Sequence, residues 1–141
     1  EVVESEQFQT GEFVTIIPYF HCGECGACRH GKTNCCEKMQ VFGVHVDGGM
    51  REYIVVEDQY ILAGNGLSTE ELALVEPLSI AAHGLRRGKI QAGEKVLVMG
   101  AGPIGLFTSL LAKIQGAEVE ISERVGFGTD FTVEKLDAYV T

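Results

Sequence analysis

Four cysteines near the start of the chain have a spacing that favours a metal site. They lie at Cys22, Cys25, Cys28 and Cys36, in the pattern C-x2-C-x2-C-x7-C. Cysteines two residues apart can turn both sulfurs toward one ion, and four thiolates complete the tetrahedral coordination of Zn²⁺ in a closed, structural site. The spacing therefore predicts a structural zinc in a lobe over residues 21–38. Glycines between the cysteines permit the turns that such a lobe needs, and basic side chains there can offset its negative charge, namely Arg29, Lys32 and Lys38.

Other uses of these cysteines remain open from the sequence. Five cysteines are an odd number for a disulfide framework, and no signal peptide is visible. A ferredoxin-type iron–sulfur run has a shorter last gap and a proline after its final cysteine, whereas Glu37 follows Cys36 here. Unligated core cysteines are a third possibility. Cys35 could replace Cys36 as the fourth ligand, and His21 and His30 could also ligate; we expect Cys36 to be the ligand.

A glycine-rich segment in the second half has the pattern G-x-G-x-x-G, at Gly100, Gly102 and Gly105. It follows a predicted strand and opens a predicted helix. Gly100 allows a tight turn, Gly102 allows a pyrophosphate to approach the backbone, and Gly105 lets the helix pack close to the sheet. The helix N-terminus supplies free N–H groups for the phosphates. The pattern predicts a dinucleotide site, and a glycine-rich turn without a ligand is the alternative.

The dinucleotide interpretation assigns further residues. The pyrophosphate is expected over Gly102, Pro103 and Ile104, and the adenosine ribose is expected at Glu123, which ends the next predicted strand. A carboxylate at this position accepts hydrogen bonds from the ribose hydroxyls and repels a 2′-phosphate. The sequence thus favours NAD over NADP, although Arg124 weakens the preference because an arginine can bind that phosphate.

The first half of the chain is predicted to contain strands and loops. β-branched and aromatic residues over 12–18 and 52–57 indicate two strands, the second after a turn signal at 47–49. Acidic residues outnumber basic residues by 12 to 4 in residues 1–75, but only by 8 to 7 in residues 76–141. The shift predicts a domain boundary between these two ranges.

Two helices are predicted next. Ser68 and Glu71 have the spacing of a capping box, which opens a short helix. Pro77 suits the first turn of a second helix, with Gly88 as its C-terminal stop.

The glycine-rich segment is predicted to lie within a βαβ unit. Strands over 95–99 and 118–122 flank a helix over 104–115, which Gly116 ends. Such units are parallel and right-handed, so the fold class is α/β.

Composition excludes several classes of protein. The chain has 141 residues, of which 45% are hydrophobic, enough for a sizeable core. The net charge of −9 argues against binding nucleic acid, since such proteins are basic. No apolar run reaches the ~20 residues of a membrane span. We expect a soluble cytoplasmic protein with no nucleic-acid or membrane partner.

A four-cysteine loop followed by a G-x-G-x-x-G βαβ unit resembles the zinc-containing medium-chain dehydrogenases of the alcohol dehydrogenase superfamily. The resemblance is strongest to their polyol branch, with sorbitol, L-idonate and threonine dehydrogenases. The matching segments are CGECGACRHGKTNCC at 22–36, DGGMREYIVV at 47–56, VEPLSIAAHGLRRG at 75–88 and VLVMGAGPIGL at 96–106.

The resemblance implies part of a GroES-like β domain with the zinc lobe, followed by part of a Rossmann domain, a doubly wound parallel sheet. It implies NAD-linked oxidation of a secondary alcohol, polyol or sugar acid in a homodimer or homotetramer. It also implies a second, catalytic zinc that polarises the substrate hydroxyl. Glu76 matches one ligand position, binding directly or through water, and an N-cap of the helix from Pro77 is its other role. A non-enzymatic zinc module or a metal-free quinone-reductase relative are the alternatives.

The chain also departs from the family pattern. The upstream cysteine and the Gly-His-Glu segment that complete the catalytic site are absent, and after Glu123 a later family segment follows directly. We therefore expect an incomplete, inactive chain with breaks between Ser5 and Phe8 and between Ser122 and Gly126.

Overall fold

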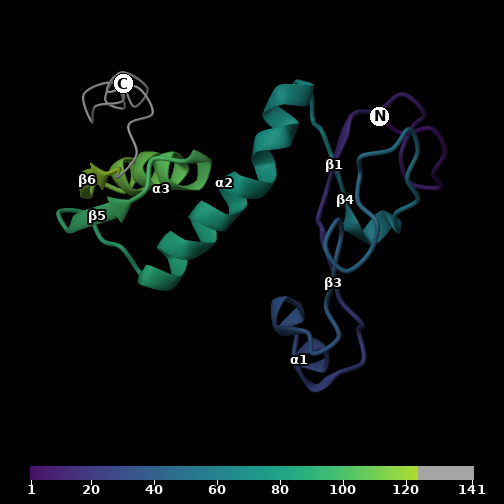
Figure 1. The fold of residues 1–141 in the computed structure, drawn as a ribbon, viewed down its shortest axis with the longest axis horizontal. Helices are drawn as coiled ribbons and strands as arrows, with labels where there is room; N and C mark the ends of the chain where they lie inside the picture. The colour runs from purple at the N-terminus through teal and green to yellow at the C-terminus, as the bar shows by residue number, and fades with distance from the viewer. Residues whose placement is uncertain (124–141) are drawn as a thin grey trace. The chain divides into compact units, whose positions relative to one another are not determined.

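The computed structural model describes residues 1–123, and the chain divides into two compact units (Figure 1). The first unit is Glu1–Ala73, and the second begins at Leu74. This division falls inside helix α2, Thr69–Gly88. The boundary expected from charge, between residues 75 and 76, lies in the same helix.

The first unit contains two short antiparallel ladders. Strand β1, Val14–Ile16, pairs with β4, Ile61–Ala63. Strand β2, Tyr19–Phe20, pairs with β3, Gln40–Val41. The strand predicted over 12–18 is confirmed in its central residues, while β2, β3 and β4 escaped prediction because they are only two or three residues long.

The strand predicted over 52–57 is wrong. These residues form no strand in the described part of the chain, and a 3₁₀ turn, Asp58–Tyr60, follows them. Tyr53 is 66% exposed and Val55 is fully exposed. Strand propensity expresses how well a side chain packs on neighbouring strands, and this segment has none beside it.

The four-cysteine lobe connects strands β2 and β3. Between these strands lie only a one-turn helix α1, Gly26–Arg29, and a 3₁₀ turn, Thr33–Cys35. Neither contains a buried residue. Regular structure and a hydrophobic core therefore contribute little to the shape of this lobe.

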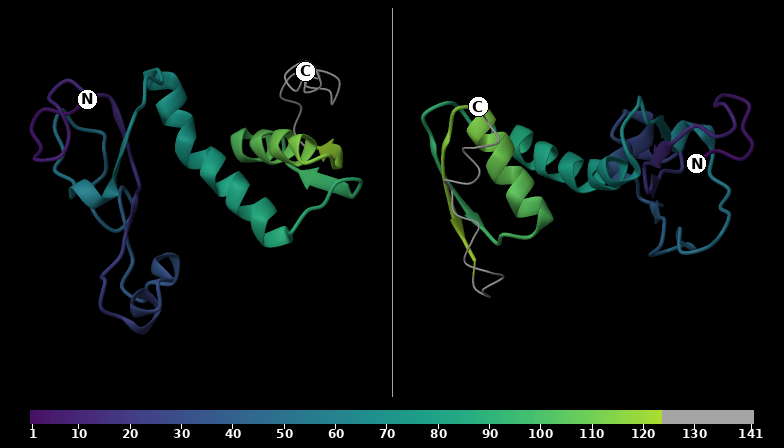
Figure 2. Two further views of the ribbon diagram at one scale, coloured as in Figure 1. Left: turned by 180° about the vertical axis from the view of Figure 1, so that it is seen from behind. Right: turned by 90° about the horizontal axis from the view of Figure 1, so that it is seen from above.

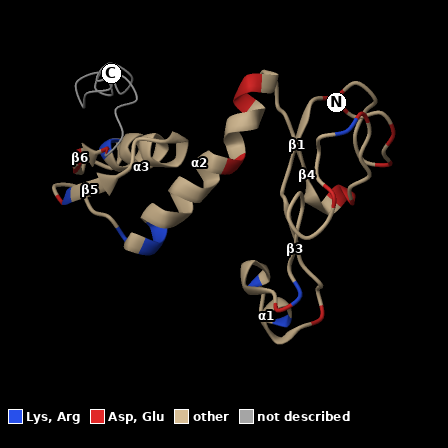
Figure 3. Cartoon of the chain, viewed as in Figure 1, with Lys and Arg blue, Asp and Glu red and all other residues tan. Residues whose placement is uncertain are grey.

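Helix α2 begins with the predicted capping box. Ser68 N donates to Glu71 Oε2 at 2.8 Å, and Glu71 N donates to Ser68 Oγ at 3.2 Å. Acidic residues lie in the first turn and Arg86 and Arg87 in the last, as Figure 3 shows in red and blue. Both ends thus complement the helix dipole.

The predicted division into two helices at Pro77 is wrong, because α2 runs through it as one helix. Proline removes one N–H donor, and its ring crowds the preceding turn. The capping box and apolar contacts of the later turns outweigh this local cost. Gly88 is the last helical residue, and Lys89 follows it with a left-handed φ of 55°.

The second unit contains the predicted βαβ arrangement. Strands β5, Lys95–Met99, and β6, Glu118–Ser122, are parallel, and α3, Pro103–Ile114, packs against both (Figures 1 and 2). The strand bounds are as predicted, and the helix begins one residue earlier. Gly116 ends this helix with a φ of 85°. The unit's core contains Leu85, Ala112 and Ala117, with Ile90, Val96, Leu111 and Val119 packed around them.

The first expected chain break, between Ser5 and Phe8, is not seen. Residues 5–8 form a local turn in which Ser5 Oγ accepts hydrogen bonds from the N–H groups of Gln7 and Phe8, at 3.0 and 3.1 Å. The second expected break, between Ser122 and Gly126, extends outside the described residues. Among residues 1–123, none of the helices has the length and apolar character needed to cross a membrane.

Candidate zinc site and nucleotide-binding turn

The four predicted zinc ligands converge at the tip of the lobe. Cys22 follows β2, Cys25 and Cys28 belong to the N-cap and body of α1, and Cys36 follows the 3₁₀ turn. Their sulfurs all lie within 4.8 Å of one another. Cys25 is buried and the other three are half-buried.

The donor set fits zinc. Four thiolates at a Zn–S distance of about 2.3 Å in tetrahedral geometry have sulfurs about 3.8 Å apart, and the Sγ atoms of Cys22 and Cys36 are 3.6 Å apart. Cys35 is exposed and lies outside the group. His30 Nδ1 is hydrogen bonded to Gly26 O at 2.7 Å instead of pointing to the cluster.

Backbone N–H groups set the electrostatics of the cluster. Those of Cys28 and Glu37 lower the pKa of Cys25 to about 6, since they stabilise its thiolate. Those of Cys22 and Lys38 likewise lower the pKa of Cys36. Desolvation, followed by the neighbouring thiols, raises the pKa of Cys28 to about 12. One thiol thus resists ionisation until a cation compensates the charge.

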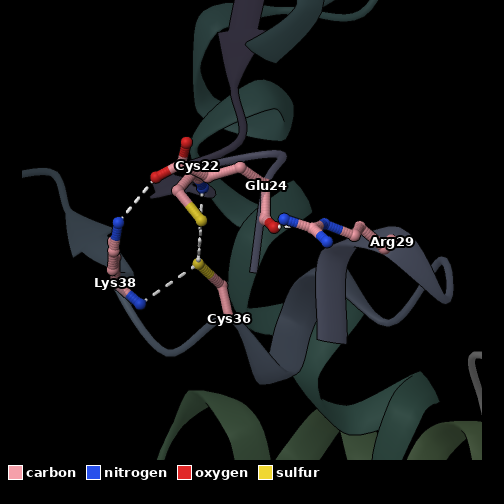
Figure 4. A network of polar contacts seen from close by, with 5 residues as sticks. All are labelled: Cys22, Glu24, Arg29, Cys36 and Lys38. Carbon is pink, nitrogen blue, oxygen red and sulfur yellow. Dashed lines mark hydrogen bonds and ion pairs between the residues drawn. The ribbon is translucent and has the colours of Figure 1, made fainter. Parts of the chain in front are cut away.

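Around the sulfurs lies a polar network (Figure 4). Lys38 Nζ pairs with Glu24 Oε1 at 2.6 Å, and Arg29 Nε donates to Glu24 O at 2.6 Å. The pair lowers the pKa of Glu24 and raises that of Lys38. The sequence indicated Lys38 and Arg29 only as general counter-charges; their partner Glu24 carries no distinguishing sequence signal.

Tyr60 anchors the base of the lobe, a role that the sequence analysis missed. Its side chain is buried, and its hydroxyl accepts from His21 N at 3.0 Å and donates to His21 O at 3.1 Å. The His21 ring lies beside the same hydroxyl, at 3.2 Å from Nδ1. The residue immediately before the first cysteine is therefore held by the 3₁₀ turn before β4.

In the second unit, the three glycines of the predicted dinucleotide turn have different surroundings. Gly100 has a φ of 104°, which side chains disfavour. A Cβ at Gly105 would lie 2.0 Å from Gly100 O, so only glycine permits this approach of helix and turn. A Cβ at Gly102 would meet no atom within 4 Å, and its φ is −71°. No contact within the described chain therefore requires a glycine at position 102. The open space at this position leaves room for a ligand to approach the backbone.

The N-terminus of α3 is suited to an anion. Gly102 is its N-cap with no side-chain cap, Pro103 lies in the first turn, and Ile104 is 46% exposed. Uncapped N–H groups and the helix dipole favour a phosphate there. These residues fit the pyrophosphate of a dinucleotide.

Glu123 lies beside this turn, as its predicted role requires. It follows β6, and its Oε2 accepts a hydrogen bond from Ala101 N at 2.8 Å. The parallel ladder brings the two strand ends together, since Met99 is opposite Ser122 and Gly100 N donates to Ser122 O at 2.7 Å. The contact to Ala101 has no sequence signal of its own.

Glu76 lies inside α2, half-buried, and its carbonyl accepts from Ser79 Oγ at 2.7 Å. Its alternative role as an N-cap is wrong, because no helix begins at Pro77.

The chain is similar to known dehydrogenases over most of its length. Residues 1–65 match the model of the alcohol dehydrogenase GroES-like domain. L-galactonate-5-dehydrogenase of Escherichia coli K12 is 49% identical over 115 residues, 82% of this chain and 34% of that protein. A crystal structure of a short chain alcohol dehydrogenase from E. coli CFT073, complexed with NADH, is 33% identical. The structural match covers 96% of this chain and 41% of the chain in that crystal structure, with a TM-score of 0.80.

The chain belongs to the zinc-containing alcohol dehydrogenase family. Its fold is accordingly part of a GroES-like domain followed by part of a Rossmann domain, as predicted. The chain spans about a third of the length of curated relatives such as this L-galactonate-5-dehydrogenase. L-threonine 3-dehydrogenase of Pyrococcus horikoshii is 38% identical over an alignment of 151 residues, which covers 97% of this chain and 43% of that protein. Since the alignment is longer than the chain of 141 residues, this family member has segments with no counterpart here.

Proposed function

We propose that the chain is part of a zinc-dependent dehydrogenase that transfers a hydride from a secondary alcohol of a polyol or sugar acid to NAD. The observation that carries the proposal is the convergence of four thiols within 4.8 Å, in a chain whose second unit has an open, uncapped glycine turn. The substrate class is supported by the relative named L-galactonate-5-dehydrogenase.

Each site has a distinct task in this proposal. Cys22, Cys25, Cys28 and Cys36 hold a structural zinc, which takes no part in the chemistry because its coordination is full. The turn at Gly100, Gly102 and Gly105, with Pro103 and Ile104, binds the pyrophosphate of NAD. Glu123 receives the ribose hydroxyls and disfavours NADP.

Glu76 is proposed to face a second, catalytic zinc, directly or through one water. Zinc held there would supply Lewis-acid polarisation of the substrate hydroxyl, and NAD would be the hydride acceptor. The regular helix α2 fixes the backbone from which the Glu76 side chain projects. We further propose a GroES-like domain over 1–75 and a NAD-binding domain from residue 76, in a cytoplasmic homodimer or homotetramer. A reducing compartment suits this proposal because it keeps the four thiols unoxidised.

Metal content and turnover of the full-length protein test the proposal. Two zincs per subunit and NAD-dependent oxidation of a polyol or sugar acid are expected, whereas one zinc and no turnover would indicate a non-enzymatic module. Glu76→Ala is expected to lower turnover by at least about 10-fold, the range seen when metal-site groups are lost. NAD affinity should change little, because the glycine turn is a separate site. Equal losses of turnover and NAD affinity would contradict the role of Glu76.

A further inference from the structure

Two adjacent cysteines compete for one ligand position in the lobe, and the structure places only one of them in the cluster. Cys36 Sγ accepts hydrogen bonds from two backbone donors, Cys22 N and Lys38 N, both at 3.3 Å. Cys35 is exposed and outside the cluster. The two donors stabilise a thiolate at Cys36 and leave Cys35 without that stabilisation.

Lys38 contacts the cluster and the opposite loop at once. Its backbone N–H reaches Cys36 Sγ, and its side chain pairs with Glu24 at 2.6 Å (Figure 4). The residue that positions the last ligand is thus tied to the loop that carries the first three ligands.

The backbone of Glu24, the partner of Lys38, is itself held by a hydrogen bond. It lies between Cys22 and Cys25, and its carbonyl oxygen is held by Arg29 Nε at 2.6 Å. The Glu24–Lys38 pair consequently links the segment that bears Cys36 to the loop that bears the other three cysteines.

We propose that Glu24 and Lys38 form a latch that selects Cys36 over Cys35 as the fourth zinc ligand and slows release of the ion. The inference rests on the structural zinc of the proposed function. To lose the ion, the segment bearing Cys36 must move away from the loop bearing the other three cysteines, and this motion separates Glu24 from Lys38. Contacts outside the ligand set orient metal ligands in this manner.

Position and charge are separable in this latch. Both side chains are 65% exposed, so the pair alone is weak in water. A lysine near a cluster of four thiolates also stabilises it by charge alone. Glu24→Ala keeps the charge of Lys38 and breaks the pair, whereas Lys38→Met removes both. Lys32→Met is the matched control, since Lys32 is an exposed lysine of the same lobe whose side chain has no hydrogen bond or ion pair among residues 1–123.

The experiment measures zinc release from the 141-residue chain into an excess of a chromogenic chelator. The expected result is that Glu24→Ala and Lys38→Met each speed release by about three- to tenfold, between the small value of an exposed pair and the 10–100-fold effect of outer contacts. Lys32→Met removes a charge of the same lobe without breaking a pair, so it should speed release less than Glu24→Ala does. Unchanged or slower release from Glu24→Ala would overturn the latch, since charge alone would then explain Lys38.

Cobalt substitution tests the choice of ligand without relying on activity. In the chain loaded with Co²⁺, Cys36→Ser should lose part of the thiolate-to-metal absorption, since three thiolates remain, and Cys35→Ser should retain it in full. Full absorption in Cys36→Ser would show that Cys35 replaces the ligand, which would overturn the selection. A chain that binds neither zinc nor cobalt would instead refute the structural zinc itself, so the two failures are distinguishable.

Discussion

The zinc lobe and the βαβ unit obtain their shapes in opposite ways. The lobe has a helix of four residues and a 3₁₀ turn of three, neither with a buried residue. The βαβ unit has two paired strands of five residues, a helix of twelve and an apolar core. Side-chain ligation is therefore expected to dominate in the lobe, and backbone pairing with apolar packing in the unit.

The same contrast applies to how the two sites recognise a ligand. In the lobe, side chains supply every ligand atom, and the surrounding N–H groups adjust their ionisation. In the proposed nucleotide site of the βαβ unit, backbone N–H groups would be the donors, because no side chain caps the helix N-terminus and none fills the space at Gly102. Loss of one cysteine side chain is thus expected to impair metal binding in the lobe. In the glycine turn, addition of one methyl group is expected to impair packing or ligand binding.

Removal of zinc should produce the largest effect and separate the two regions. Structural zinc in small domains contributes about 10–16 kcal/mol at neutral pH, and the lobe has little else to hold it. Cys28→Ser or a strong chelator should therefore abolish amide-exchange protection over residues 21–38, with little change over residues 95–122. Hydrogen exchange read by mass spectrometry provides the measurement.

Cys35→Ser is the matched control for this loss, because Cys35 lies outside the cluster. Its exchange profile should equal that of the unaltered chain. Equal protection of the lobe with and without zinc would contradict the difference between the regions.

Gly105→Ala should destabilise the βαβ unit. The new Cβ would lie 2.0 Å from Gly100 O, so the backbone must move. We expect the free energy of unfolding to fall by about 1–3 kcal/mol, as for other overpacked sites. Urea unfolding followed by circular dichroism measures the change.

Gly102→Ala is the matched control in the same turn. Its Cβ would meet no atom within 4 Å and its φ suits alanine, so stability should change by less than about 0.5 kcal/mol. NAD affinity should nevertheless fall, because the methyl occupies the path of the pyrophosphate. Wild-type NAD affinity in Gly102→Ala would argue against the assigned pyrophosphate position.

The smallest effect is expected at Glu123, where the ribose role and the bond to Ala101 can be separated. Glu123→Gln keeps an acceptor oxygen and removes the charge, whereas Glu123→Ala removes both. Both variants should narrow the preference for NAD over NADP, by up to about tenfold, because repulsion of the 2′-phosphate is lost. Calorimetric titration with each cofactor measures the ratio.

Only Glu123→Ala should speed exchange of the Ala101 amide proton, since glutamine can still accept its hydrogen bond. Nuclear magnetic resonance measures this rate. Faster exchange in Glu123→Gln as well would mean that the charge, and not the acceptor, holds the turn. An unchanged cofactor ratio in both variants would remove Glu123 from the cofactor site.

Local signals in the sequence were sufficient for much of this molecule. The cysteine spacing, the capping box at Ser68 and Glu71, and the βαβ unit around Gly100 each depend on residues close together in the chain. Short-range geometry determines such features, since metal-binding turns, helix ends and tight glycine turns are completed within a few residues.

Tertiary structure decided the rest. Segment 52–57 has the composition of a strand but lacks a neighbour to pair with, and Pro77 lies inside a helix whose other contacts outweigh its local cost. The placement of Cys36 in the cluster while Cys35 stays outside involves backbone donors from Cys22, fourteen residues away, and from Lys38. The sequence supplied the candidate residues, and long-range contacts, which depend on how separate segments pack, determined which of them meet.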